Sequence, residues 1–115
     1  YPCYIEGIFM TPEKKVKNKV TKVLQANECY YFYPATGGYG SSGVPDIVAC
    51  YNGHFIGIEC KANGNKPTAL QNKHLSDIKK AGGYSMVIDE TDIDALELFF
   101  KTQEYRFNII ERIDT

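Results

Sequence analysis

The stretch GVPDIVACYNGHFIGIECK, residues 43–61, sets two acids and a lysine into a run of strand-forming apolar residues. Within it, Asn52-Gly53 is the strongest short-range signal for a hairpin with a two-residue type I′ turn. That turn puts Tyr51 opposite His54 and fixes the pairing of the other residues in the two strands. The stretch therefore predicts a β-hairpin whose register follows from its turn.

In this register the two acids of the stretch meet. Asp46 falls opposite Glu59, and Lys61 shares their face of the hairpin. The opposite face is apolar and carries Ile47, Ala49, Ile56 and Ile58. Opposed side chains in an antiparallel pair have Cβ atoms roughly 4.5 to 5.5 Å apart, where like charges are destabilising. Two carboxylates so placed predict a bound cation.

The nature of the ligands indicates which cation. Oxygen ligands favour a hard ion that keeps several waters, so we expect Mg²⁺ or Mn²⁺. A zinc site from Cys50, His54 and Cys60 is an alternative, but the register points Cys50 and Cys60 to opposite faces. A surface salt bridge between Lys61 and the acids is another alternative, and it would be energetically minor. It would not explain why acids lie between apolar strands.

Residues 11–27 predict the first helix. Thr11 is a favourable N-cap, Pro12 suits the first helical position, and valines recur at helical spacing. Glu13 lies at the edge of the core-facing stripe, where the helix dipole by itself favours an acid. The lysines of this helix would ordinarily form a solvated surface.

Residues 66–83 predict a second helix, with a capping box from Thr68 to Gln71 and a glycine pair at the end. Gln71 therefore has a structural role on sequence grounds alone. The apolar residues expected to face the sheet are Leu70, Leu75 and Ile78.

The rest of the chain completes an alternating order of helices and strands. Residues 28–34 and 84–89 predict strands, and residues 91–101 predict a third helix. The apolar tail 104–113 fits either helix or strand. The glycine- and serine-rich loop 35–43 lacks the lysine of a phosphate-cradling loop, so no nucleotide cofactor is expected.

Composition is that of one domain without a membrane span. The 115 residues are 43% hydrophobic, and thirteen basic against fourteen acidic residues give a net charge of -1, so affinity for nucleic acid would come from local clusters. Four cysteines without CxxC spacing suit a reducing compartment, and a secretory signal is absent. We expect a cytoplasmic protein, with residues 1–10 as a leader or expression remnant and residues 11–115 as the single domain.

The combination of Pro45-Asp46, a hairpin and Glu59-Cys60-Lys61 resembles the signature of the PD-(D/E)xK nuclease superfamily. The longer pattern, which covers roughly residues 11–90, more closely resembles the VRR-NUC family, whose small stand-alone members occur in phages and bacteria. The resemblance implies an α/β fold of the restriction endonuclease-like kind, a mixed sheet with a central hairpin flanked by helices.

The same resemblance implies an Mg²⁺- or Mn²⁺-dependent endodeoxyribonuclease that hydrolyses phosphodiester bonds. The ion would be held by Asp46, Glu59 and the Cys60 main-chain carbonyl, with Lys61 near the attacking water. The ion would polarise the scissile phosphate and lower the pKa of a bound water.

The resemblance also implies roles for two further residues and indicates the binding partners of the chain. Glu13 matches the first-helix acid of related junction-resolving nucleases, and Gln71 matches the glutamine that lies beside the catalytic lysine. Stand-alone relatives resembling this chain resolve four-way DNA junctions, a task that a two-fold dimer suits. The expected partners are therefore branched DNA and a second copy of the chain, inside a bacterium or a phage-infected cell. Candidate DNA-binding lysines are Lys14, Lys17, Lys66 and Lys73.

Other functions stay open at this point. A restriction-type or general DNA nuclease would share the site, although sequence-specific readout normally needs additional segments. A non-catalytic DNA-binding accessory protein of the same fold is disfavoured, because Asp46, Glu59 and Lys61 are all present. Candidate interface or junction-contacting elements are residues 30–33, 37–43 and 107–113.

Overall fold

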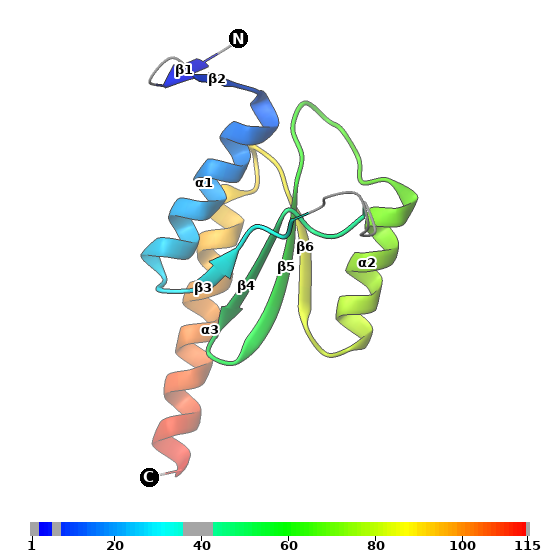
Figure 1. The fold of residues 1–115 in the computed structure, drawn as a ribbon. Coiled ribbons are helices and arrows are strands. Elements are labelled where there is room, and N and C mark those ends of the chain that lie inside the picture. Colours follow the sequence, from blue (N-terminus) through cyan, green and yellow to red (C-terminus); the bar gives the residue numbers. More distant parts are fainter. Residues whose placement is uncertain (1–2, 6–7, 36–42, 115) are drawn as a thin grey trace.

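The computed structural model describes residues 3–5, 8–35 and 43–114 of the 115-residue chain, and the side chains of residues 10–35 and 43–103. Its main body is a four-stranded sheet with helices on both faces (Figure 1). The elements in chain order are β1 (Cys3–Ile5), β2 (Ile8–Met10), α1 (Pro12–Ala26), β3 (Tyr30–Phe32), β4 (Ile47–Tyr51), β5 (His54–Cys60), α2 (Ala69–Lys80), β6 (Tyr84–Ile88) and α3 (Ile93–Asp114). Among the described residues, no helix is both long and apolar enough to cross a membrane.

The central hairpin has the predicted register. β4 and β5 pair antiparallel through Asn52-Gly53, whose φ angles of 49° and 82° are those of a type I′ turn. The ladder ends at the pair Ile47 and Ile58. Asp46, which the predicted register places across from Glu59, therefore lies in a bend just before β4, one residue beyond the last regular pair.

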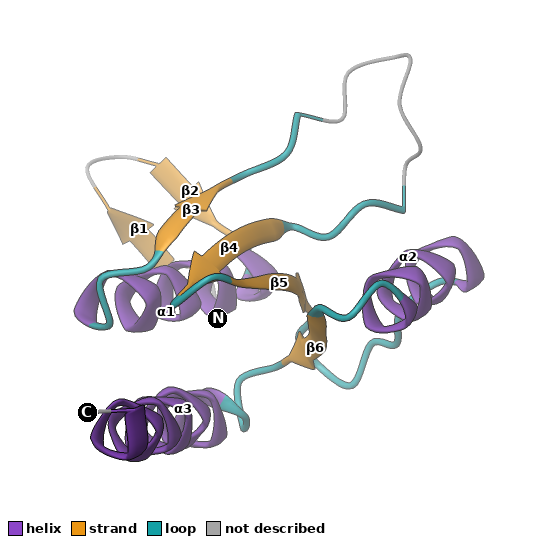
Figure 2. Ribbon diagram, turned by 90° about the horizontal axis from the view of Figure 1, so that it is seen from below, coloured by secondary structure: helices purple, strands orange, loops and turns teal. Residues whose placement is uncertain are grey.

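The sheet is mixed and has the order β3-β4-β5-β6, with β5 and β6 parallel and the other neighbours antiparallel. Figure 2 shows α1 and α3 on one face and α2 on the other. Because side chains alternate along a strand, Ile56 and Ile58 of β5 belong to the core under α1 and α3, while Gly57 and Glu59 face α2. This alternation turns Glu59 toward the first turn of α2.

The hydrophobic core lies between the sheet and the pair of helices α1 and α3. Its fully or nearly fully buried members are Val16, Val20, Val23, Leu24, Ile47, Ala49, Ile56, Ile58, Leu96 and Phe100. The helical spacing of the valines presents one stripe of α1 to the sheet. Burial of that stripe holds the N-terminal turn of α1, with Glu13, beside the start of β4 and the end of β5.

Four regions outside the central hairpin can be compared with the sequence predictions. Within residues 1–10, β1 and β2 pair antiparallel, and Met10 is buried; the interpretation of this segment as a leader stays a prediction. α3 begins at Ile93 and not at Thr91, because the Thr91 hydroxyl donates to Asp89. The tail continues as the same helix. Leu70 is 40% exposed and lies against Gly43, so its predicted place on the sheet was wrong.

Gly57 sets how closely α2 packs on the sheet. A Cβ atom at this position would lie 2.6 Å from Ile78 Cδ1 and 3.1 Å from Pro45 Cγ. We expect Gly57→Ala to destabilise the fold by about 1 to 3 kcal/mol through overpacking, as measured by urea unfolding. Adding Ile78→Val removes the nearer atom and should recover part of that loss. Strictly additive effects of the two substitutions would contradict this account.

Candidate active site

The predicted site residues lie near the open end of the central hairpin. Asp46 precedes β4, Glu59 lies near the end of β5, and Lys61 follows β5 directly. Glu13 is in the first turn of α1, and Gln71 is in the first turn of α2. Residues far apart in the sequence thus converge where four elements begin or end.

Asp46 is held by the main chain of β5. Its Oδ2 accepts a hydrogen bond of 2.9 Å from the Cys60 amide. Asp46 can make this bond because it lies in the bend before β4. In the bend its side chain can reach the Cys60 amide at the end of β5. The bond fixes the Asp46 carboxylate beside Glu59.

Glu59 is the most unusual group of the site, because it is an acid only 1% exposed. Its Oε1 accepts a hydrogen bond of 3.3 Å from Gln71 Nε2, whereas its buried Oε2 has no partner among the described residues. Burial, followed by the negative charge of the neighbouring Asp46, raises the pKa of Glu59 to about 8. Lys61 lowers this pKa and Glu13 raises it. Two carboxylates this close require a positive charge if both are to ionise near neutral pH.

This pair fits a divalent cation. The unpaired Glu59 Oε2 and the neighbouring Asp46 carboxylate offer oxygen ligands of the kind that Mg²⁺ and Mn²⁺ prefer. In the described part of the chain, no three His, Cys, Asp or Glu side chains form a ready metal cage. Water and a main-chain carbonyl would have to complete the coordination, which suits Mg²⁺ because it usually keeps several waters.

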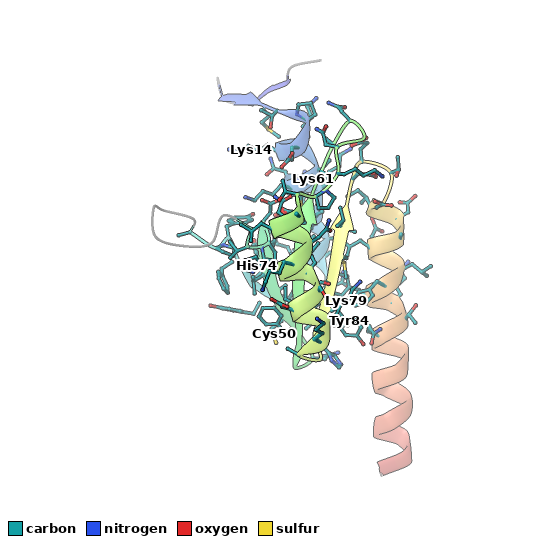
Figure 3. All side chains as sticks on the ribbon, turned by 90° about the vertical axis from the view of Figure 1, so that its right-hand side faces the viewer. Lys14, Cys50, Lys61, His74, Lys79 and Tyr84 are labelled. Atoms are coloured by element: carbon teal, nitrogen blue, oxygen red, sulfur yellow. The ribbon has the colours of Figure 1, made fainter. Side chains whose placement is uncertain are left out.

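The alternative zinc site lacks its ligand geometry. Cys60 is buried, and that burial, followed by the charges of Asp46 and Glu59, raises the pKa of its thiol to about 12. Among the described residues, Cys50, His54 and Cys60 do not come together in a group that could hold a metal ion. Cys50 is exposed near the turn end of the hairpin, as Figure 3 shows, whereas Lys61 lies at the other end.

Lys61 stands immediately beyond β5, where its main-chain amide donates to the Ile88 carbonyl at 3.0 Å. This bond continues the contact between β5 and β6 and fixes the backbone from which the lysine projects. The side chain is half-buried, and its charge lowers the pKa of Glu59, so the ammonium group acts on the acidic pair. Figure 3 shows Lys61 at the same end of the sheet as Lys14.

Gln71 has two partners whose chemistry sets its orientation. The Thr68 amide, which can only donate, gives a hydrogen bond of 2.9 Å to Gln71 Oε1, and this is half of the predicted capping box. The amide nitrogen is therefore turned toward Glu59, to which it donates. The helix cap of α2 thus positions a hydrogen-bond donor on the buried acid.

We expect Gln71→Glu to separate these two roles. Glutamate serves equally well in a capping box, so unfolding stability should stay close to that of the wild type. A carboxylate facing Glu59 would repel it, and cleavage and Mn²⁺ affinity should fall by about 10- to 100-fold, measured by gel assay and calorimetric titration. Gln71→Ala should lower both stability and activity. Wild-type cleavage by a folded Gln71→Glu variant would show that the Glu59 contact is dispensable.

An open pocket of about 650 Å³ adjoins Asp46. It is lined by Thr11, Pro12, Glu13, Lys14, Lys17, Asn18, Tyr33, Asp46, Cys60, Ala62, Asn63 and Asn65. Of the candidate DNA-binding lysines, Lys14 and Lys17 thus lie at the site. Lys66 and Lys73 are exposed and do not line this pocket, and Lys73 forms an ion pair of 2.9 Å with Asp77.

Sequence reasoning did not place three polar lining residues at the site, namely Asn18, Asn63 and Asn65. The sequence could have indicated Asn63 and Asn65, because Asn63-Gly64-Asn65 is a turn motif that follows Lys61 closely in the chain. Tyr33 belongs to a segment predicted to contact a second copy or the junction, but its place in this pocket depends on the packing of α1 against the sheet.

Comparison with known proteins agrees with this geometry. No family model matches the sequence. "Putative nuclease p44" of Acyrthosiphon pisum secondary endosymbiont phage 1 is 40% identical over 58 residues, which are 50% of this chain and only 62% of that protein. A solved structure described as "VRR_NUC domain" aligns with a TM-score of 0.64 and 21% identity, covering 76% of this chain and 95% of that one. This chain therefore has the fold of a VRR_NUC domain, which is the fold that its sequence resemblance to the VRR-NUC family implies.

Proposed function

We propose that this chain is an Mg²⁺- or Mn²⁺-dependent endodeoxyribonuclease. The observation that carries the proposal is the pairing of buried Glu59 with half-buried Asp46 close to the charge of Lys61. Glu59 Oε2 has no partner among the described residues, and Asp46 lines an open pocket. Acids with strongly shifted pKa values cluster at functional sites, so a buried acid whose pKa is raised to about 8 supports this proposal. The similarity to a phage protein named as a nuclease points in the same direction.

The chain supplies the ligands and their orientation. Asp46, Glu59 and the Cys60 main-chain carbonyl would hold the ion, with Glu13 as a possible fourth contributor from the pocket wall. When bound, the ion would polarise the scissile phosphate and lower the pKa of a coordinated water. The Cys60 amide holds Asp46, and Gln71 holds Glu59, so both acids are oriented before a substrate arrives.

Lys61 would act on the reacting groups themselves. Its ammonium group can orient the attacking water or offset the negative charge that develops on the phosphate. The half-buried position beside Glu59 favours such a role, because electrostatic effects are stronger where water is partly excluded. Lys14 and Lys17 at the pocket would contact the phosphates of the bound strand.

We further propose that the substrate is branched DNA, cut by a homodimer in the cytoplasm of a bacterium or a phage-infected cell. One chain carries one acidic pair, and paired incisions across a four-way junction need two such pairs related by symmetry. β3 lies at an edge of the sheet with Tyr30 73% and Phe32 48% exposed, which supplies an apolar surface for a second copy. The other two candidate interface segments, residues 37–43 and 107–113, fall where the structure leaves the loop or the side chains undescribed.

The proposal is tested by cleavage of matched DNA substrates. Four-way junctions, linear duplex and single strands are compared in Mg²⁺, Mn²⁺, Ca²⁺ and chelator, alongside sedimentation of the protein. We expect activity with Mg²⁺ and Mn²⁺, little with Ca²⁺, none in chelator, and faster cutting of junctions by a dimer. Full activity in excess chelator would remove the metal-dependent mechanism. Equal rates on linear and branched DNA, or a strict monomer on junctions, would remove only the junction-resolving part.

A further inference from the structure

Tyr33 forms part of the wall of the pocket that opens onto Asp46, and α1 holds its ring in place. The Tyr33 hydroxyl lies 2.7 Å from Thr21 Oγ1, and Thr21 in turn donates its single hydroxyl hydrogen to the Lys17 carbonyl at 2.9 Å. Tyr33 is therefore the donor of the bond to Thr21. Lys17 Nζ also lies 4.5 Å from the centroid of the ring. These contacts fix the ring relative to the acidic pair.

The ring is held firmly and still reachable from solvent. Tyr33 is 47% exposed, although its hydroxyl and one flank are engaged and Tyr31 packs edge-on with centroids 6.0 Å apart. An aromatic ring that is already immobilised loses little conformational entropy when a ligand stacks on it. Tyr33 therefore offers a preformed stacking surface a short way from the site of hydrolysis.

The other pocket side chains offer the complementary contacts. Lys14 and Lys17 provide ammonium groups that suit phosphate oxygens, and the side-chain amides can hydrogen-bond to base edges. The amides belong to Asn18, Asn63 and Asn65. A pocket of about 650 Å³ is within the range of sites that enclose a small molecule. One aromatic face, two cations and several amides match the parts of a single nucleotide.

We infer that this pocket takes one unstacked nucleotide of the cut strand, next to the scissile phosphate, with its base stacked on Tyr33. The inference rests on the proposed function and names how the substrate is selected. Both faces of a base inside a duplex are covered by its neighbours, so the base reaches Tyr33 only after it leaves the stack. Nucleotides at a branch point or in an unpaired segment do so most easily. Tyr33 would thus favour branched DNA over linear duplex without reading sequence.

A purely structural role for Tyr33 predicts a different response to the DNA. If the tyrosine only ties the segment after β3 to α1, its replacement weakens binding regardless of which bases the DNA carries. If it stacks on one base, removal of that base has no further effect once the ring is gone. The two roles are therefore distinguished by a double-mutant cycle, in which one change is a substitution of Tyr33 and the other is an abasic site in the DNA.

The experiment measures binding of a four-way junction in Ca²⁺, with a single abasic site moved through the positions around the cut. For the wild type, we expect one position at which the abasic site weakens binding by about 10- to 100-fold. Tyr33→Leu should bind the intact junction less tightly by a similar factor and should be insensitive to the abasic site at that position. Phe55→Leu is the matched control, since Phe55 is 48% exposed but lies outside the pocket, and it should respond like the wild type. Equal abasic penalties in wild type and Tyr33→Leu would overturn the inference.

A measurement on the wild-type protein covers the case in which Tyr33→Leu does not fold. A junction that carries 5-iododeoxyuridine at the sensitive position should form a photochemical crosslink to Tyr33, identified by mass spectrometry. A crosslink elsewhere, or none at any position around the cut, would overturn the inference. Wild-type protein that cuts no DNA removes the proposed function together with this inference, whereas cutting with a base-insensitive Tyr33 removes the inference alone.

Discussion

Glu59→Gln is expected to lower DNA cleavage by at least about three powers of ten while leaving the folded protein at least as stable as the wild type. Glutamine keeps the shape of the side chain but loses the charge that would bind the cation, and a metal ion contributes several kcal/mol to stabilisation of the transition state. Stability is retained because burial and Asp46 already raise the pKa of Glu59 to about 8, so the uncharged form is the one that the fold accommodates at neutral pH. Asp46→Asn should behave in the same way, since its oxygen can still accept from the Cys60 amide.

The measurements are single-turnover cleavage of junction DNA and thermal unfolding with and without Mg²⁺. The wild type should gain stability from Mg²⁺, and Glu59→Gln should not. Glu97→Gln is the matched control, because Glu97 is an exposed acid on α3, and it should leave both readouts unchanged. Normal turnover in a folded Glu59→Gln or Asp46→Asn variant would reject the site.

Lys61→Met is expected to lower the cleavage rate by roughly two to four powers of ten, with cation affinity changed by less than about tenfold. Methionine keeps the apolar part of the side chain and removes only the charge that would orient water or stabilise the transition state. The backbone hydrogen bond from residue 61 to Ile88 does not depend on the side chain, so the end of β5 should keep its place.

Cleavage rates and calorimetric titration with Mn²⁺ separate the two effects of this substitution. Lys79→Met is the matched control, since Lys79 is an exposed lysine that Figure 3 shows well away from Lys61, toward the C-terminal end of α2. It should cut at the wild-type rate. If Lys61→Met lost Mn²⁺ binding and its rate recovered at high Mn²⁺, Lys61 would be a positioning residue for the ion and not a participant in the reaction.

Short-range sequence patterns predicted the residues at the centre of the site. The turn chemistry of Asn52-Gly53 fixed the register of the hairpin, and side-chain alternation then put Asp46, Glu59 and Lys61 at one end. The bend at Asp46 lay beyond this reasoning, because it depends on a hydrogen bond from the Cys60 amide and not on strand pairing. Turn preferences and alternation act over a few residues, so they can be read without knowledge of the rest of the fold.

The sequence by itself determined the hairpin, the helix starts at Thr11 and Thr68, and the position of the acidic pair, because each depends on residues close together in the chain. Only the tertiary structure decided that Glu59 is buried and that Gln71 donates to it, since both require α2 to pack against the sheet. The pocket wall at Tyr33 likewise depends on the burial of the apolar stripe of α1. Glu59 is desolvated only when elements distant in the sequence pack around it. Its raised pKa therefore results from tertiary packing, and no local sequence pattern predicts it.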